Sequence, residues 1–258
     1  MKVISAIFGR KVKILMVLKF MVENNSQTSS GKNIRVVTNI LTKALKLWLK
    51  SQVSEISQLD IHIQTSDRQL LTGNVPLVSI GANYAVYQGL HLTKVQLVAE
   101  NIRINIGSIL KGKAIKLLEI VPVVGELSME EVDLNTSISS DLLSTALNDV
   151  LDKLLPEDSL KSKPTKCQKI VLDNSQLILF CVSGTEGQES TFSEIRLNVE
   201  MISGQELHIS QIEVQYNNGQ MFKNEQGMTF YLGTDVDIQE LKLIPGKLVC
   251  RGRINVNP

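Results

Sequence analysis

The sequence has few of the residues that most often carry catalytic or nucleic-acid chemistry. Its 258 residues include three histidines, three cysteines and only 4% aromatic side chains. No phosphate-binding glycine loop, G-x-S-x-G elbow or H-E-x-x-H zinc motif is present. The histidines His62, His91 and His208 fall on the polar phase of alternating patterns, so we expect them to face solvent. The sequence therefore predicts no catalytic residue, no metal and no cofactor, and the scarcity of aromatic stacking platforms disfavours nucleic-acid binding.

The cysteines are dispersed rather than clustered. Cys167, Cys181 and Cys250 are odd in number, widely spaced and outside any C-x-x-C pair. This spacing disfavours both a zinc site and a disulfide framework. We therefore expect three small, buried, free thiols, which fit a reducing compartment.

Long uninterrupted apolar runs are also missing. Two lysines interrupt the apolar part of residues 1–22, so this segment is a poor secretory signal and too short an apolar run to span a bilayer. Residues 1–50 carry ten basic residues and one acid, whereas the remainder carries 17 basic and 25 acidic residues. We expect residues 1–32 to be either a basic segment on a membrane surface or an unstructured or wrongly started leader. A single domain then follows over residues 33–258.

One predicted helix, Arg35–Ser51, has a broad apolar face and a polar face that is basic and contains no acid. Two interpretations fit this pattern: the apolar face packs on a sheet as core, or part of it lines a lipid site with the lysines near phosphate head groups. The residues predicted to contact lipid are Leu41, Leu45, Trp48, Lys43, Lys46 and Lys50.

A second amphipathic helix is predicted over residues 140–155. Ser140 is placed to cap its start, Asp141 complements the helix dipole, and Pro156 ends it. Its leucines recur in adjacent pairs every four residues, which is typical of a helix that packs in a core.

Most of the remaining chain alternates between apolar and polar residues, as in antiparallel strands with one covered face. Four segments share the pattern apolar-x-apolar-x-x-apolar-x-apolar: residues 90–97, 127–134, 207–214 and 236–243. An extra residue in mid-strand turns later side chains to the wrong face unless a β-bulge absorbs it, and bulges bend strands. Some x-x pairs, such as Thr93-Lys94, could instead be tight hairpin turns.

The expected fold class is therefore α+β, with strongly curved, mostly antiparallel sheets and two principal helices, one of them packed on the concave apolar face. Glu130 and Glu131 are expected on opposite faces of a strand, too far apart to act as a carboxylate pair. The four shared segments also suggest an internal duplication that relates residues 54–134 to residues 165–256.

Several long stretches resemble a known family. They are LKLWLKSQV (45–53), DRQLLTGNVPLVSI (67–80), AVYQGLHL (85–92), ENIRINIGSILKGK (100–113) and LGTDVDIQELKLIPGKLVCRGRI (232–254). Together they are similar to the LmeA-like phospholipid-binding family, in particular its cyanobacterial-type branch, over about residues 33–258. The resemblance implies a tubular lipid-binding-like fold, in which a curved sheet wraps around a helix and forms an apolar groove for acyl chains.

These patterns and the resemblance lead to one expected function. We expect a non-enzymatic phospholipid-binding or lipid-transfer protein, peripheral to an anionic membrane at its cytoplasmic face, with a phospholipid or other acyl lipid as partner. The alternative is a membrane-associated structural or assembly factor that binds a protein partner through the same apolar surface. A lipid hydrolase would need a nucleophile–base pair, for which only the three histidines are available.

Overall fold

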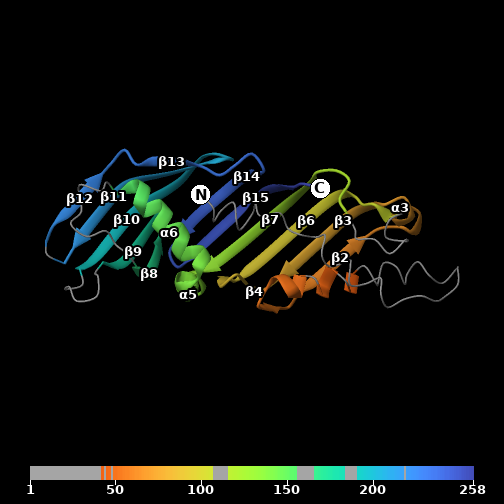
Figure 1. Ribbon diagram of the computed structural model, residues 1–258, viewed down its shortest axis with the longest axis horizontal. Coiled ribbons are helices and arrows are strands. Elements are labelled where there is room, and N and C mark those ends of the chain that lie inside the picture. The colour runs from red at the N-terminus through yellow and green to blue at the C-terminus, as the bar shows by residue number, and fades with distance from the viewer. Residues whose placement is uncertain are drawn as a thin grey trace.

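The computed structural model describes residues 42–43, 45–47, 49–106, 116–155, 166–183, 191–217 and 219–258. The predicted leader and the beginning of the first predicted helix lie outside these residues, whereas residues 42–43, 45–47 and 49–52 are helical. The molecule is elongated, and its strands cross the long axis obliquely (Figure 1).

The larger continuous layer is a six-stranded sheet in the order β14-β15-β7-β6-β3-β2, and every pair in it is antiparallel. Its strands are β2 (Asp60–Gln64), β3 (Asn74–Ala82), β6 (Lys94–Arg103), β7 (Val121–Glu130), β14 (Val236–Ile244) and β15 (Lys247–Val256).

A second sheet has the order β12-β11-β10-β9-β8, with β13 also paired to β11. Its strands are β8 (Lys166–Asp173), β9 (Gln176–Ser183), β10 (Thr191–Ser203), β11 (Glu206–Tyr216), β12 (Met221–Asn224) and β13 (Met228–Tyr231). A small sheet combines β1 (Glu55–Ser57), β4 (Tyr84–Tyr87) and β5 (Leu90–Leu92). All pairs in these sheets are antiparallel too, so the antiparallel α+β architecture predicted from alternation is confirmed.

The helices are α3 (Asp67–Leu71), α5 (Glu131–Thr136) and α6 (Asp141–Leu154), with a 3-10 turn over Ser137–Ser139. Helix α6 confirms the second predicted helix, including its cap, because the Ser140 side chain accepts a hydrogen bond from the Leu143 N–H at 3.2 Å. The buried residues Leu147, Leu151 and Leu154 belong to the same apolar cluster as the second sheet.

Buried apolar residues of four strands meet in the interior between α6 and the second sheet. The register places Ile170, Leu179, Ile195 and Val214 side by side across β8, β9, β10 and β11, and none of them is more than 1% exposed. These four residues therefore form the centre of a well-packed core.

Two of the four repeated segments contain β-bulges, as predicted. On β11 an extra residue lies between Ser210 and Glu213, where Gln211 has a φ of 48°. On β14 the pairing shifts between Ile238 and Glu240, which leaves Gln239 as the extra residue. In both segments the bulge absorbs the x-x pair and keeps the apolar residues on one face.

The other two segments are junctions rather than bulged strands. Thr93 lies between the small-sheet strand β5, which ends at Leu92, and β6 of the six-stranded sheet, which begins at Lys94. Thr93-Lys94 is therefore neither a bulge nor a hairpin turn. Glu130 ends β7 and Glu131 begins α5, so the prediction that both lie on one strand is wrong. In each segment one apolar cluster takes residues from both elements, Leu92 and Val95 in the first segment and Met129 and Leu134 in the second. The pattern is not wholly buried, because Leu97 lies outside this cluster and Val132 is exposed.

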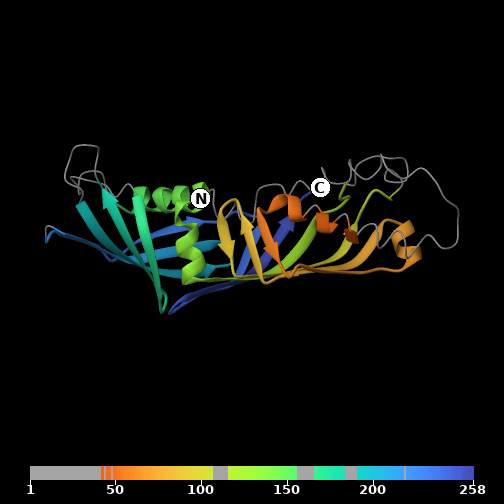
Figure 2. The ribbon, with the colours of Figure 1, turned by 90° about the horizontal axis from the view of Figure 1, so that it is seen from below.

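The two larger sheets follow each other along the long axis (Figure 1). Figure 2 shows α6, the small sheet and the helical residues 42–43, 45–47 and 49–52 on one side of them. Backbone hydrogen bonds join the sheets where turns meet strands: Ser175 N–H donates to the Leu243 carbonyl at 3.1 Å, and Ile238 N–H donates to the Gly204 carbonyl at 2.7 Å. The sheets are thus held in a fixed relation.

Candidate functional site

The six-stranded sheet has one face that is wholly apolar along its register. One row across all six strands consists of Val236, Ile254, Val123, Ala99, Val78 and Ile63. A neighbouring row consists of Ile238, Gly252, Gly125, Leu97, Ile80 and Ile61. Since side chains alternate between faces along a strand, these rows share one surface.

The apolar face is closed at its two ends by separate hydrophobic cores. Near β14, Cys250 and Leu243 cluster with Leu90 of the small sheet and Leu134 of α5. At the far end, Leu70 of α3 clusters with residues that include Val75, Ile104, Leu117 and Val121. The apolar face is therefore the one turned toward the small sheet and α5.

Between these two cores lies a stretch that belongs to neither. We call it the middle row: Gly252, Gly125, Leu97, Ile80 and Ile61, one residue from each of β15, β7, β6, β3 and β2. All five are half-buried, and the three with side chains pack against neither cluster of the described residues. The middle row thus combines an apolar surface with incomplete cover, which an ordinary core would not leave.

The two glycines of the middle row are register partners, and each accommodates a neighbour. A Cβ atom at Gly252 would lie 2.7 Å from the backbone oxygen of Asp237 and 2.9 Å from the Cα of Ile238, close to the bulge on β14. A Cβ atom at Gly125 would lie 2.9 Å from Leu97 Cδ2. A glycine beside a bulge permits a sharp local bend of the sheet.

The opposite face of the same sheet carries several ion pairs. Arg251 of β15 donates from Nε to Glu126 and from Nη1 to Glu240, both at 2.8 Å. The pKa of Arg251 is raised, chiefly by its hydrogen bond to Glu126 and then by the negative charges of Glu126 and Glu240. The pKa of Glu240 is lowered, mainly by a hydrogen bond from Lys242. One face of this sheet therefore suits water, and the other suits hydrocarbon.

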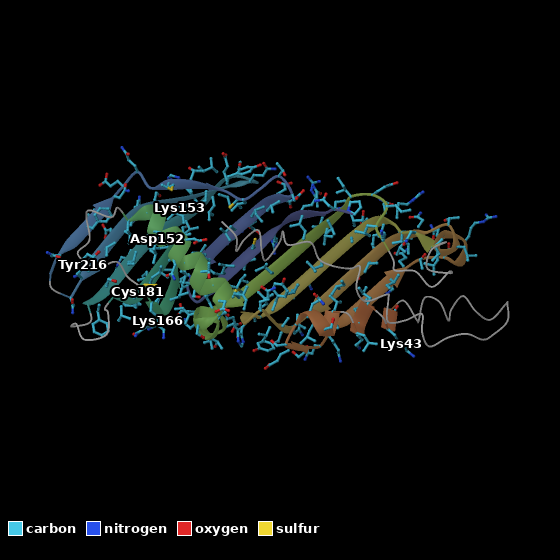
Figure 3. The ribbon with its side chains drawn as sticks, in the orientation of Figure 1. Lys43, Asp152, Lys153, Lys166, Cys181 and Tyr216 are labelled. Carbon is cyan, nitrogen blue, oxygen red and sulfur yellow. A yellow bond between two sulfur atoms is a disulfide. The ribbon has the colours of Figure 1, made fainter. Side chains whose placement is uncertain are left out.

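The residues predicted to contact lipid are only partly described. Lys43, Lys46 and Lys50 are exposed on the helical segment, and Leu45 is half-buried. Leu41 and Trp48 lie outside the described residues. Figure 3 shows Lys43 far along the long axis from the labelled residues of α6 and the second sheet. The middle row was not singled out from the sequence, although the alternating apolar residues of β2, β3 and β6 were a visible signal for it.

The three histidines lie in different environments. His62 is exposed on β2, as predicted. His91 is half-buried, with Nδ1 2.6 Å from the Tyr84 hydroxyl, and His208 is half-buried, with Nδ1 3.1 Å from Thr229 Oγ1. The prediction that all three face solvent freely is therefore wrong for two of them, because the strands next to them supply hydroxyl partners.

Two further features of the described chain bear on function. Among its His, Cys, Asp and Glu residues, no group of three or more is arranged to hold a metal ion. None of its helices combines the length and the apolar character that crossing a membrane requires.

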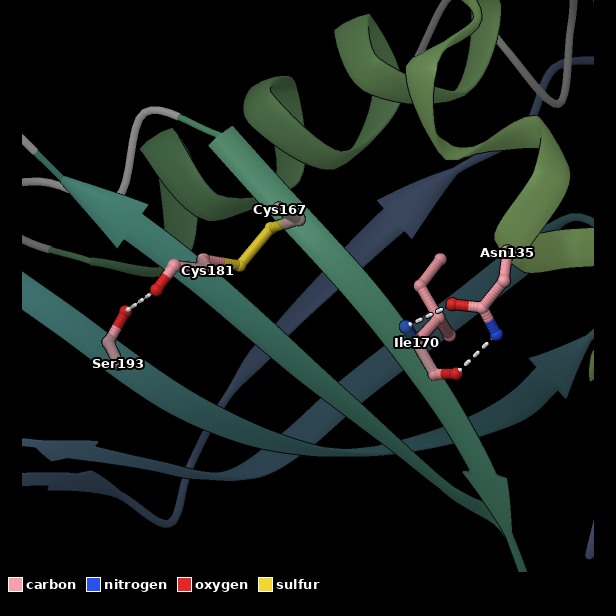
Figure 4. The surroundings of a disulfide bond; sticks show 5 residues. All are labelled: Asn135, Cys167, Ile170, Cys181 and Ser193. Carbon is pink, nitrogen blue, oxygen red and sulfur yellow. Dashed lines mark hydrogen bonds between the residues drawn. A yellow bond between two sulfur atoms is a disulfide. The ribbon is translucent and has the colours of Figure 1, made fainter.

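Two of the predicted free thiols form a disulfide instead. Cys167 of β8 and Cys181 of β9 are register partners, and their sulfur atoms are bonded (Figure 4). The prediction of three free thiols is therefore wrong for this pair. Cys250 is free and buried as expected, and burial raises the pKa of its thiol to about 11.

A cavity of about 430 Å³ lies beside the disulfide, between α6 and the edge strand β8. Its lining is mixed rather than apolar: Ile138, Ser139, Ser144, Leu147, Asn148, Lys166, Cys167 and Gln168. Polar side chains line part of this cavity, whereas the middle row is wholly apolar. The middle row is the better candidate for acyl chains.

Fold and site together define an elongated antiparallel protein whose apolar sheet face is left partly uncovered between two cores. A family model described as LmeA-like phospholipid-binding matches residues 33–253, and the chain belongs to this family. This match confirms the family resemblance found in the sequence. Searches among curated proteins and among solved structures found no significant match.

Proposed function

We propose that the protein binds a phospholipid without chemically changing it, and that it carries lipid to or from an anionic membrane on which it is peripheral. The observation that carries this proposal is the half-buried middle row between two closed cores. Acyl chains laid along Leu97, Ile80 and Ile61 would remove apolar surface from water, at about 25 cal/mol for each Å² buried. Membership of a phospholipid-binding family supports the choice of ligand.

The head group is proposed to lie near the helical segment. Lys43, Lys46 and Lys50 are exposed and have no carboxylate partner among the described residues, so they are free to contact phosphate. Leu41, Leu45 and Trp48 would cover the chains from the opposite side. Each basic residue near an anionic surface contributes about 1 kcal/mol, and salt weakens the attraction.

The disulfide bears on the compartment in which this happens. Bonded cysteines persist in oxidising compartments and are rare in the cytosol. The Cys167–Cys181 bond therefore removes the thiol-based argument for the cytoplasmic face and supports the oxidising side of a membrane.

The proposal is tested by native mass spectrometry and lipid extraction of the purified protein, with one matched pair of variants. Leu97→Asn changes the middle row, whereas Val98→Asn changes the next residue of β6, which is also half-buried but on the opposite face. We expect about one lipid per chain in the native protein and in Val98→Asn, and a several-fold loss in Leu97→Asn. A lipid-free native protein that forms a stable complex with another protein would instead favour an assembly factor.

A further inference from the structure

The outer face of the second sheet carries an exposed apolar cluster. Phe180 of β9 is 36% exposed and Phe192 of β10 is 55% exposed. They lie on diagonal positions of adjacent antiparallel strands, because Phe192 is the register partner of Val182 and Phe180 that of Glu194. Alternation puts them on the face opposite Leu179 and Ile195, which fill the core beneath α6. We call Phe180, Phe192 and their half-buried neighbours Val171, Ile178 and Val182 the outer patch.

Basic residues border the outer patch on β8. Lys169 is the register partner of Phe180, and its Nζ lies 5.7 Å from the centroid of that ring. Lys166 is the register partner of Val182. Both lysines are exposed, and neither has a carboxylate partner in the part of the chain that the structure describes.

Two acids on this face, Glu194 and Glu213, form ion pairs with basic neighbours. Glu194 pairs with Arg196 at 2.6 Å, and Glu213 pairs with Lys223 at 2.5 Å. The hydrogen bond from Lys223 is the main cause that lowers the pKa of Glu213. The unpaired charges beside Phe180 and Val182 are therefore those of Lys166 and Lys169, whereas the exposed Asp173 lies farther along β8, opposite Gln176.

We propose that the outer patch docks the protein onto an anionic lipid bilayer, with Phe180 and Phe192 inserted among the head groups and Lys166 and Lys169 contacting phosphates. Aromatic rings with neighbouring lysines suit the boundary between water and lipid, because the rings enter the apolar region while the ammonium groups remain hydrated. A second copy of the chain is a poorer occupant, because two such faces would bring unpaired lysines together.

This surface is separate from the lipid site of the proposed function. In Figure 3 Lys166 lies toward the end of the molecule that holds Cys181 and Tyr216, whereas Lys43 lies far along the long axis. The inference rests on the proposed function only in taking a membrane as the source or destination of the lipid.

The test is co-sedimentation of the full chain with vesicles of phosphatidylcholine, with and without 30% phosphatidylglycerol. We expect binding only to the anionic vesicles, and weaker binding at high salt. Phe180→Ser/Phe192→Ser and Lys166→Gln/Lys169→Gln should each lower the vesicle affinity about tenfold or more. Matched controls outside the patch are Val124→Ser/Val132→Ser and Lys94→Gln/Lys116→Gln, all exposed positions that should keep native affinity.

Thermal unfolding of each variant checks that the fold is retained, and native mass spectrometry measures its bound lipid. Unchanged lipid content with lost vesicle binding supports the docking surface. Two results would overturn the docking surface. One is native vesicle affinity in both patch variants; the other is a dimer that Phe192→Ser dissociates while vesicle binding stays unchanged. A native protein that binds vesicles through the patch but carries no lipid would contradict the proposed function and leave the docking surface standing.

Discussion

The side-chain amide of Asn135 on α5 hydrogen-bonds both backbone groups of Ile170 on β8. Its Nδ2 donates to the Ile170 carbonyl, and its Oδ1 accepts from the Ile170 N–H, each at 2.8 Å (Figure 4). Glu131 Oε2 accepts from the Leu172 N–H at 2.9 Å. Since β8 is an edge strand, these side chains take the place of a neighbouring strand and block pairing with another chain.

We expect Asn135→Ala to lower the free energy of unfolding by about 1–3 kcal/mol, because it leaves two backbone groups of β8 without partners. Urea unfolding measures this loss, and hydrogen exchange should show faster exchange at Ile170. Thr136→Ala is the control, since its exposed hydroxyl bonds only within α5. Equal effects of the two substitutions would contradict a role for Asn135 in protecting the edge.

A bulge on β8 explains why the spacing of the cysteines did not reveal the disulfide. From Asp173, opposite Gln176, to Lys169, opposite Phe180, the β8–β9 hairpin is regular. If that register continued, Gln168 would lie opposite Cys181. A bulge at Gln168 shifts the register by one residue and brings Cys167 there instead. Bulge positions depend on packing across the sheet, so no count of residues between the cysteines could reveal the bond.

Contacts between distant parts of the chain also mark the limit of what the sequence could predict. Alternation predicted the antiparallel strands, and the capping pattern predicted α6 to within a residue. The bulge pattern was right at Gln211 and Gln239 but wrong at Thr93, whose N–H bonds the Ser128 carbonyl of another sheet at 3.0 Å. Local spacing is identical in these segments, and only contacts distant in sequence distinguish a bulge from a junction.

Loss of the disulfide should destabilise the protein measurably. A bond closing about 15 residues contributes about 3 kcal/mol by restricting the unfolded chain, and its separation here is 14 residues. We expect Cys167→Ser/Cys181→Ser to lower the urea midpoint, and dithiothreitol to lower that of the native protein to the same value. Dithiothreitol should not change the urea midpoint of the double variant. If it also left the midpoint of the native protein unchanged, the bond would be absent.

Cys250 should react slowly with thiol reagents in the folded protein. Burial raises its pKa from 9.0 to about 11, so about one thiol in a thousand is ionised at pH 8. Alkylation at pH 8 should be far slower in native protein than in urea. Because the folded state holds this proton more tightly, stability is fully retained below pH 9 and falls as the pH rises toward 11. Cys250→Ala should flatten that fall.

The glycine pair of the middle row should respond unequally to an added methyl group. At Gly252 the new Cβ would meet the backbone of Asp237 and Ile238, which cannot move without disturbing β14. We expect Gly252→Ala to cost about 2 kcal/mol in the free energy of unfolding. At Gly125 the obstacle is the flexible end of Leu97, so Gly125→Ala should change stability by less than about 1 kcal/mol, helped by the lower backbone entropy of alanine. Urea unfolding compares the two variants. A similar loss at both positions would contradict the inference that the β14 backbone yields less than the Leu97 side chain.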